Sequence, residues 1–308
     1  MGTPAFVIPV LDSLFGSDRE IVGVYTNRDL PRGRGRQQGR TPVKEYATQK
    51  GLQVFEPNSL RTLEARKCLE SLSPDVVVLA AYGKLVPEEL LEIPRWGFLN
   101  IHPSLLPKYR GPSPVQTALL DGERKTGASL IQLDKGIDSG PVLGQKETAI
   151  RETELVLDLT RRLFQLGSEL LLETLPGWGS GSTVPKIQDE GCASYTRKLS
   201  KEDGKVEWDS ASNVIFRRYK AFTPWPGLFT HWDGRILKLI TLSTSPEHIH
   251  GEPGTVVPLT QQGEPAIGII TKDGTVCVDS LQLEGRRVQP SGEFLRGRPD
   301  ILGARLPN

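Results

Sequence analysis

The 308-residue chain has few of the residues from which disulfide or metal scaffolds are built. It contains three cysteines, Cys68, Cys192 and Cys277, which are far apart and form no CxxC pair. This odd number offers no zinc framework and is typical of reduced thiols in a cytosolic protein. The H-x-H pair of His248 and His250 has no evident third ligand, so we expect no metal site.

Long hydrophobic runs and an excess of charge are also missing. No apolar run approaches the roughly 20 residues needed to cross a bilayer, and the opening "MGTPAFVIPV" lacks the basic and apolar regions of a signal peptide. The formal net charge is +1, so overall charge identifies no partner. We expect a cytoplasmic protein that makes no membrane contact, and we take it to be a monomer.

The first half of the chain alternates strand and helix signals. Its continuous β-branched runs are typical of buried parallel strands, and the intervening segments have helical spacing. The predicted strands are 21–26, 75–82, 98–102, 126–134 and 142–150, and the predicted helices are 61–72, 112–120 and 154–174. This βαβ order predicts an α/β fold with a Rossmann-like, doubly wound, mostly parallel sheet.

The second half has a different pattern. The segment "PGWGSGSTVPKIQDEG" reads as the start of a linker, and a helix near 211–221 is followed by short strands between turns. Asp233-Gly234 and Asp273-Gly274 are strong hairpin signals. We therefore expect one domain at 1–175, a linker at 176–203 and an all-β barrel at 204–308.

One stretch, "FLNIHPSLLPKYRGPSP", combines a strand with polar groups at its end. Asn100 and His102 are two residues apart, so they point to the same face of the strand, and Pro103 ends it. Ligand sites in open α/β sheets lie beyond such strand ends. The alternative is a purely structural role, in which His102 forms a hydrogen bond that caps the strand.

A carboxylate completes this candidate site. Asp138, in the turn "GIDSG", could orient the imidazole of His102, although turn aspartates are common without any function. An amide donor, an imidazole and a carboxylate suit acyl transfer, which requires a stabilised oxyanion and a moved proton. Because no GxSxG elbow occurs, we expect direct attack by a substrate amine rather than a covalent intermediate.

A second motif, "NRDLPRGRGRQQGRTPVK" at 27–44, carries six basic residues and one acidic residue. Its glycines do not fit GxGxxG, which argues against a dinucleotide site. An arginine-rich loop beside an α/β active site favours a clamp for a phosphate backbone, and the alternative is a solvated basic loop.

Together these motifs resemble the 10-formyltetrahydrofolate-dependent formyltransferases. "NIHPSLLPKYRGPSP" and "GIDSG" carry this resemblance, and "MGTPAFVIPVLDSL", "PRGRGRQQGRTPVK" and "YTRKLSKEDGKVEWD" with "AFTPWPG" make it most similar to those acting on methionyl-tRNA. The resemblance covers almost the whole chain. It implies a Rossmann-like catalytic domain and a C-terminal OB-like β-barrel that helps to hold tRNA.

The resemblance also implies roles for individual residues. The implied catalytic residues are Asn100, His102 and Asp138. The implied folate-contacting turn is Ser104, Leu105, Leu106 and Pro107. The implied tRNA-binding residues are Arg32, Arg34, Arg36 and Arg40. The implied reaction transfers the formyl group of 10-formyltetrahydrofolate, a co-substrate, to the α-amino group of methionyl initiator tRNA for translation initiation, without a metal.

The sequence leaves two alternative functions open, and it departs from the family at one point. A formyltransferase acting on an amino sugar nucleotide, or a 10-formyltetrahydrofolate hydrolase, would share the three catalytic residues. A non-catalytic RNA-binding protein would use the barrel and the basic loop. Family members begin with a short apolar strand before the "GTP" turn, so we expect such residues to be encoded upstream of Met1.

Overall fold

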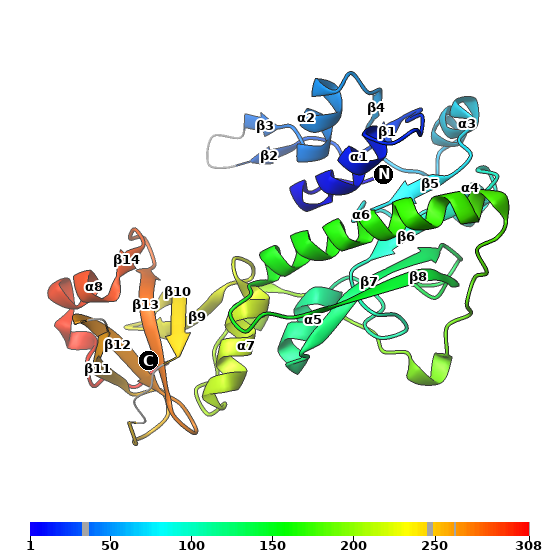
Figure 1. The fold of residues 1–308 in the computed structure, drawn as a ribbon. Helices are drawn as coiled ribbons and strands as arrows, with labels where there is room; N and C mark the ends of the chain where they lie inside the picture. The colour runs from blue at the N-terminus through cyan, green and yellow to red at the C-terminus, as the bar shows by residue number, and fades with distance from the viewer. Residues whose placement is uncertain (33–36, 245–248, 262, 308) are drawn as a thin grey trace. The chain divides into compact units, whose positions relative to one another are not determined.

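The computed structural model describes residues 1–32, 37–244, 249–261 and 263–307, which form two compact units (Figure 1). Unit 1 comprises Met1–Val115, Arg124–Arg151 and Leu157–Arg197. Unit 2 comprises Gln116–Glu123, Glu152–Val156 and Lys198–Asn308. Within the described ranges, no helix combines the length and the apolarity that a membrane span requires.

Unit 1 is a mixed α/β structure. Its strands are β1 (Val24–Tyr25), β4 (Val54–Phe55), β5 (Val77–Leu79), β6 (Phe98–His102), β7 (Lys125–Gln132) and β8 (Val142–Ala149). The pairs β1–β4 and β5–β6 are parallel, although β4 was not among the predicted strands. The pairs β6–β7 and β7–β8 are antiparallel, so the four-stranded sheet is mixed rather than mostly parallel as predicted. The helices are α1 (Ile8–Phe15), α2 (Pro42–Gln49), α3 (Leu63–Leu72), α4 (Glu88–Leu91) and α6 (Val156–Ser180). The helix α5 (Pro114–Asp121) begins in unit 1 and belongs to unit 2 from Gln116 on.

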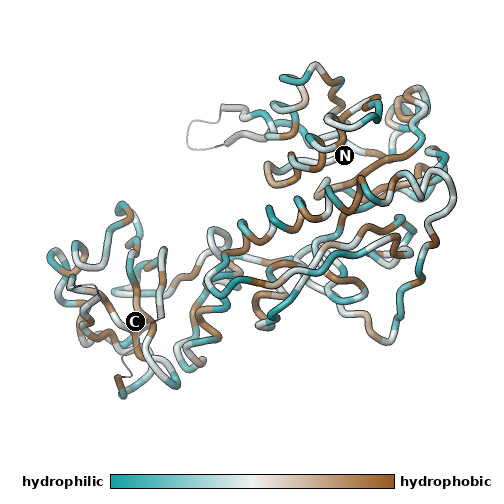
Figure 2. Tube along the Cα trace, viewed as in Figure 1, coloured by the Kyte–Doolittle hydropathy of each residue, from teal (hydrophilic) through white to brown (hydrophobic). Residues whose placement is uncertain are grey.

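The strand β6 is apolar because both faces of the sheet are covered. Leu99 and Ile101 pack with Phe164 of α6 in one hydrophobic cluster, while Phe98 packs with Val77 in another. Hydrophobic and hydrophilic residues alternate along α6 in Figure 2, as expected for a helix with one face on a core. This two-sided packing explains the continuous apolar run from which the strand was predicted.

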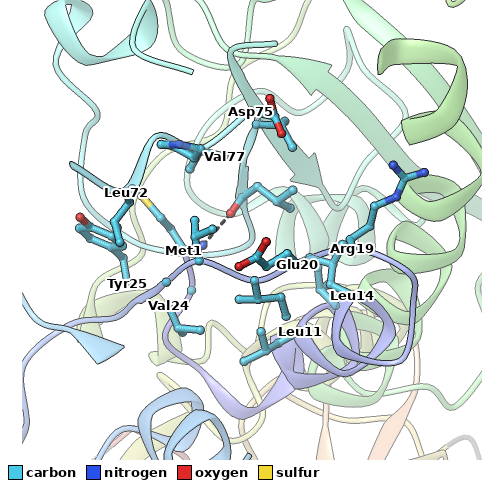
Figure 3. Close-up of a pocket in the computed structure, with 18 of the residues that line it drawn as sticks. Met1, Leu11, Leu14, Arg19, Glu20, Val24, Tyr25, Leu72, Asp75 and Val77 are labelled. Carbon is cyan, nitrogen blue, oxygen red and sulfur yellow. Dashed lines mark hydrogen bonds between the residues drawn. The ribbon is translucent and has the colours of Figure 1, made fainter. Parts of the chain in front are cut away.

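The first residues of the chain lie between the β1–β4 pair and β5. The Gly2 amide donates to the Tyr25 carbonyl oxygen at 2.9 Å, and Gly2 forms a parallel bridge with Ala80. Beside them lies a cavity of about 390 Å³, lined mainly by apolar side chains that include Leu11 and Leu72 (Figure 3).

The helix α6 continues to Ser180 and therefore runs through "PGWGS", where the composition favoured a linker. Pro176 lies inside the helix and removes one backbone hydrogen bond. Trp178, two residues later, secures this end of the helix, because its indole Nε1 donates to the Trp96 carbonyl oxygen at 2.9 Å. A tertiary contact thus overrides the local helix-breaking signal.

Unit 2 contains an antiparallel sheet in the order β11-β12-β13-β10-β9, with β14 paired to β13. The strands are β9 (Leu228–Trp232), β10 (Arg235–Thr244), β11 (Val256–Gln261), β12 (Glu264–Ile270), β13 (Thr275–Leu283) and β14 (Gln289–Pro290), and the helices are α7 (Ser212–Phe222) and α8 (Ser291–Gly297). Asp233 and Gly234 both have positive φ, 52° and 66°, as a tight β9–β10 hairpin requires.

The predicted barrel is not closed among the described residues, because β9 and β11 are not paired with each other. Other segments cover these edges instead. The Val206 amide donates to the Phe229 carbonyl oxygen at 2.9 Å, and the Val256 amide donates to the Ala304 carbonyl oxygen at 2.9 Å. Covered edges remove the unpaired groups that would otherwise favour closure or aggregation.

Candidate active site

The end of β6 delivers the two predicted polar side chains to one face of the sheet. The strand spans Phe98–His102, the same residues as the predicted run. Asn100 Nδ2 donates to Asp138 Oδ1 at 3.4 Å, and His102 Nδ1 lies 3.6 Å from Asp138 Oδ2. The three predicted residues therefore meet, although 36 residues separate His102 from Asp138 in the chain (138 − 102).

The imidazole of His102 is held from both sides. Its Nε2 lies 2.9 Å from the Tyr109 carbonyl oxygen, and because a carbonyl only accepts, this nitrogen carries a proton. Its Nδ1 faces the Asp138 carboxylate at ion-pair distance. His102 is only 4% exposed, whereas the Asp138 side chain is 17% exposed. The carboxylate is thus the more accessible member of the pair.

Asp138 occupies a left-handed backbone conformation in the loop between β7 and β8, with φ of 50°. This conformation is uncommon for residues other than glycine, although Asp tolerates it better than most. Gly140 follows closely, and a Cβ there would lie 1.8 Å from the Gln132 carbonyl oxygen. The two glycines and the aspartate of "GIDSG" therefore form a turn with little freedom for substitution.

The site contains a backbone donor that was not predicted from the sequence. The Gly111 amide donates to Asp138 Oδ2 at 2.8 Å, which is the shortest hydrogen bond to this carboxylate. Gly111 has φ of 104°, a value that favours glycine. The glycine in "KYRGPSP" indicates a turn in the sequence. The sequence does not indicate that its amide bonds Asp138, because Asp138 lies in a different segment of the chain.

The turn predicted to contact folate is rigidly held. Ser129 Oγ donates to the Ser104 carbonyl oxygen at 2.6 Å and accepts the Leu106 amide at 3.0 Å. Ser104 and Leu106 are buried, whereas Leu105 and Pro107 are half-buried. The first two side chains support the turn, and the latter two are the ones accessible to a ligand.

The basic motif at 27–44 contains two short strands, β2 (Leu30–Arg32) and β3 (Gln37–Gly39), which pair antiparallel. Arg34 and Arg36 lie outside the described residues. Arg32 ends β2, and Arg40 is exposed just after β3. Of the four arginines expected to contact RNA, the structure therefore places only Arg32 and Arg40, at this hairpin.

An ion pair network anchors the base of this hairpin. Lys44 Nζ lies 2.7 Å from Asp29 Oδ2 and 2.7 Å from Glu56 Oε2. The hydrogen bond from Lys44 lowers the pKa of Asp29, and the same bond raises the pKa of Lys44. The segment before the hairpin is therefore tied to the helix α2 that follows it.

None of the three site residues lines the 390 Å³ cavity beside Met1 and Gly2. The cavity wall is mainly aliphatic and offers no arrangement like that of Asn100, His102 and Asp138. Among the described residues, no cluster of His, Cys, Asp and Glu is placed to hold a metal ion. The converging polar groups at the end of β6 are therefore the candidate active site.

Comparison with known proteins matches both units to one family. The profile described as "Formyl transferase" matches residues 1–175, and "Formyl transferase, C-terminal domain" matches residues 198–299. A methionyl-tRNA formyltransferase of Geotalea daltonii is 38% identical over 306 residues, covering 99% of this chain and 96% of the relative. One of Thermus thermophilus is 41% identical over 305 residues, covering 99% and 97%.

A solved structure shares the fold at lower identity. HypX from Aquifex aeolicus in complex with tetrahydrofolic acid superposes with a TM-score of 0.61 at 23% identity. The match covers 81% of this chain and 43% of HypX.

Proposed function

The chain belongs to the formyl transferase family, and we propose that it transfers a formyl group from 10-formyltetrahydrofolate to the α-amino group of methionine on initiator tRNA. Relatives that carry the methionyl-tRNA formyltransferase name match it over nearly their full length. The observation that carries the chemistry is the meeting of Asn100, His102 and Asp138 at the end of β6. The reaction belongs to translation initiation, which we take to be cytoplasmic here.

The proposed reaction needs one bond formed, one bond broken and one proton moved. The methionyl amine attacks the formyl carbon, the bond from that carbon to folate N10 breaks, and the amine proton ends on N10. Asn100 donates to the formyl oxygen as that oxygen gains negative charge. Its Nδ2 has two hydrogens, and the weak 3.4 Å contact with Asp138 uses only one of them.

The proton is handled by His102 and Asp138 together. Because the carboxylate is more exposed than the imidazole, we propose that Asp138 faces the attacking amine. His102 then lies on the buried side of the carboxylate and interacts with it through Nδ1. Charge on the imidazole during the transfer is stabilised by the nearby carboxylate. The bond from Nε2 to Tyr109 keeps the ring oriented, so the proton path runs through Nδ1.

The donor and acceptor substrates are proposed to bind on either side of these groups. Leu105 and Pro107 are the accessible members of the turn next to β6, which supports contact with the folate ring system. The basic hairpin supports contact with the tRNA backbone. The antiparallel sheet of unit 2, which we propose to be an OB-like module, would hold more of the tRNA.

A direct assay tests the function. The purified chain is given 10-formyltetrahydrofolate with either charged initiator tRNA or an amino sugar nucleotide, and N-formyl product is measured. We expect product from the tRNA alone. Formylation of the sugar nucleotide in preference to the tRNA, or release of formate without either acceptor, would replace our proposal with one of the two family alternatives.

A salt titration tests the basic hairpin separately. Arg34→Ala with Arg36→Ala should weaken tRNA binding and reduce the slope of log affinity against log salt by about one for each lost phosphate contact. Unchanged affinity across salt concentrations would leave the hairpin as a solvated surface feature.

A further inference from the structure

The segment 188–196, which lies within the predicted linker, packs along the turn that follows β6. The Arg110 amide donates to the Ser194 carbonyl oxygen at 2.8 Å, and the Thr196 amide donates to the Arg110 carbonyl oxygen at 2.7 Å. Ser194 Oγ accepts the Tyr109 amide at 2.8 Å. The segment therefore supports the same turn whose Tyr109 carbonyl and Gly111 amide contact His102 and Asp138.

One side chain of this segment reaches the loop of Asp138 directly. Gln188 is 6% exposed, and its Nε2 donates to the Asp138 carbonyl oxygen at 2.8 Å and to the Gly140 carbonyl oxygen at 2.7 Å. These two acceptors flank Ser139, so a single amide group fixes the backbone on both sides of the turn. This restraint acts where Asp138 adopts its left-handed conformation.

Arg110 determines which way the Gln188 amide points. Its Nε donates to Gln188 Oε1 at 3.0 Å, so the amide oxygen faces the guanidinium and the NH₂ group must face the Asp138 loop. With the opposite orientation, two donors would meet at Arg110 and an oxygen would meet two carbonyls. The guanidinium thus selects the amide orientation that holds the loop.

Arg110 is itself fully buried and held by other groups of the segment. Its terminal nitrogens bond both oxygens of Glu190, at 2.9 and 2.7 Å, and Nη1 also donates to the Tyr195 hydroxyl at 2.9 Å. The Glu190 hydrogen bonds raise the pKa of Arg110, and the guanidinium lowers the pKa of Glu190. A buried cation needs such pairing, because an unpaired one is strongly destabilising.

We infer that Gln188 and Arg110 are positioning residues for formyl transfer, which hold the Asp138 carboxylate at its place beside His102 and the Gly111 amide. Neither side chain contacts Asn100 or His102 in the contacts described for them, so they act through Asp138. The inference rests on the proposed function for its effect on catalysis. Its structural part, the restraint of the loop, can be measured without any substrate.

The experiment compares Gln188→Leu and Arg110→Lys with two controls. Leucine keeps the approximate volume of Gln188 and removes three hydrogen bonds, whereas lysine keeps the charge but not the fork that reaches Gln188 and Glu190 together. The controls are Gln282→Leu, which removes a hydrogen bond in unit 2, and Ser168→Ala, which removes the bonds of a buried hydroxyl to Gln165 and Ser13.

We expect kcat for methionyl-tRNA to fall about 10²-fold in both test variants, because a displacement of about 1 Å can have that effect. KM for tRNA should change less than about threefold, since these residues are not proposed to contact it. In hydrogen exchange of the ligand-free protein, the Gly111 amide and the 136–141 loop should exchange at least about tenfold faster than in the wild type, as expected when local opening becomes easier. Both controls should keep wild-type kcat and exchange.

The possible failures are distinguishable. If the wild type forms no formyl-methionyl-tRNA, the proposed function fails, and the exchange data still decide whether Gln188 restrains the loop. If the wild type is active and folded Gln188→Leu keeps both kcat and slow exchange, the positioning role is wrong. An equal loss of kcat in Ser168→Ala would also overturn it, by showing a general effect of lost buried bonds. Should Gln188→Leu not fold, Arg110→Lys is judged by the same readouts.

Discussion

Replacing Asp138 by Asn removes one negative charge from the site and leaves the side chain nearly the same size. The new amide oxygen can still accept the Gly111 amide, which bonds Oδ2 at 2.8 Å in the native chain. The new NH₂ group would then face Asn100 Nδ2, now 3.4 Å from Oδ1, so two donors would meet. The reversed orientation is worse, because it places NH₂ against the closer Gly111 donor. We therefore expect the fold to persist and the charge effect to dominate.

The magnitude follows from the separation of His102 Nδ1 and Asp138 Oδ2, which is 3.6 Å. Two unit charges at this distance interact by about 4–5 kcal/mol at an effective dielectric constant of 20. The carboxylate is partly exposed, so solvent screening reduces this figure. A remaining 3–4 kcal/mol, about 10²–10³ in rate, is the expected loss of transition-state stabilisation.

The assay is single-turnover formylation of charged initiator tRNA at saturating 10-formyltetrahydrofolate, with thermal unfolding measured on the same samples. We expect kcat of Asp138→Asn to fall about 10²–10³-fold while the unfolding midpoint changes little. Asp134→Asn is the matched control, because Asp134 lies in the same loop and accepts hydrogen bonds from Gly136 and Ser139, which are not part of the proposed catalytic trio. If Asp138→Asn keeps kcat within about fivefold of the wild type, the carboxylate has no part in proton transfer and the reasoning from charge is refuted.

Three further predictions concern other parts of the chain. Gly140→Ala places a Cβ 1.8 Å from a backbone oxygen of β7, so urea unfolding should show a loss of more than about 2 kcal/mol; an unchanged midpoint would refute the packing argument. Lys44 holds the pKa of Asp29 below its usual 3.8, so this stabilisation is present above pH 3.8 and is lost as pH falls further; the unfolding free energies of wild type and Lys44→Met should differ at pH 6 and converge near pH 3. Burial raises the pKa of the Cys277 thiol to about 11, so Cys277 should react with a disulfide reagent only after unfolding. The exposed Cys192 should react in the native state.

Much of the candidate site was predictable because its signals are local. The run from Phe98 to His102 has a buried apolar residue on each face, Phe98 on one and Leu99 and Ile101 on the other, and a proline follows it; its predicted bounds agree with the structure. The two-residue period of a strand then placed Asn100 and His102 on one face. The glycines around Asp138 marked a tight turn between two strands, and the structure has that turn.

The remaining features depend on contacts between distant segments, which local patterns do not encode. In the sequence Gly111 looks like an ordinary turn glycine. Its role depends on the bond from its amide to the Asp138 carboxylate, which belongs to the loop between β7 and β8. The end of α6 was missed because Pro176 and its neighbouring glycines predict a linker, whereas Trp178 secures the helix through Trp96. The strand β1 is only Val24–Tyr25, shorter than the apolar run that predicted it.

The buried Arg110 also bears on the alternative of a non-catalytic RNA-binding protein. Burying a guanidinium and fixing Asp138 with φ of 50° are both unfavourable unless other interactions offset them. A protein that only bound RNA would gain nothing from a carboxylate held 3.6 Å from an imidazole at the end of a strand. An enzyme that moves a proton between two nitrogen atoms does gain from it, because the transferring groups must already be in place when the amine attacks.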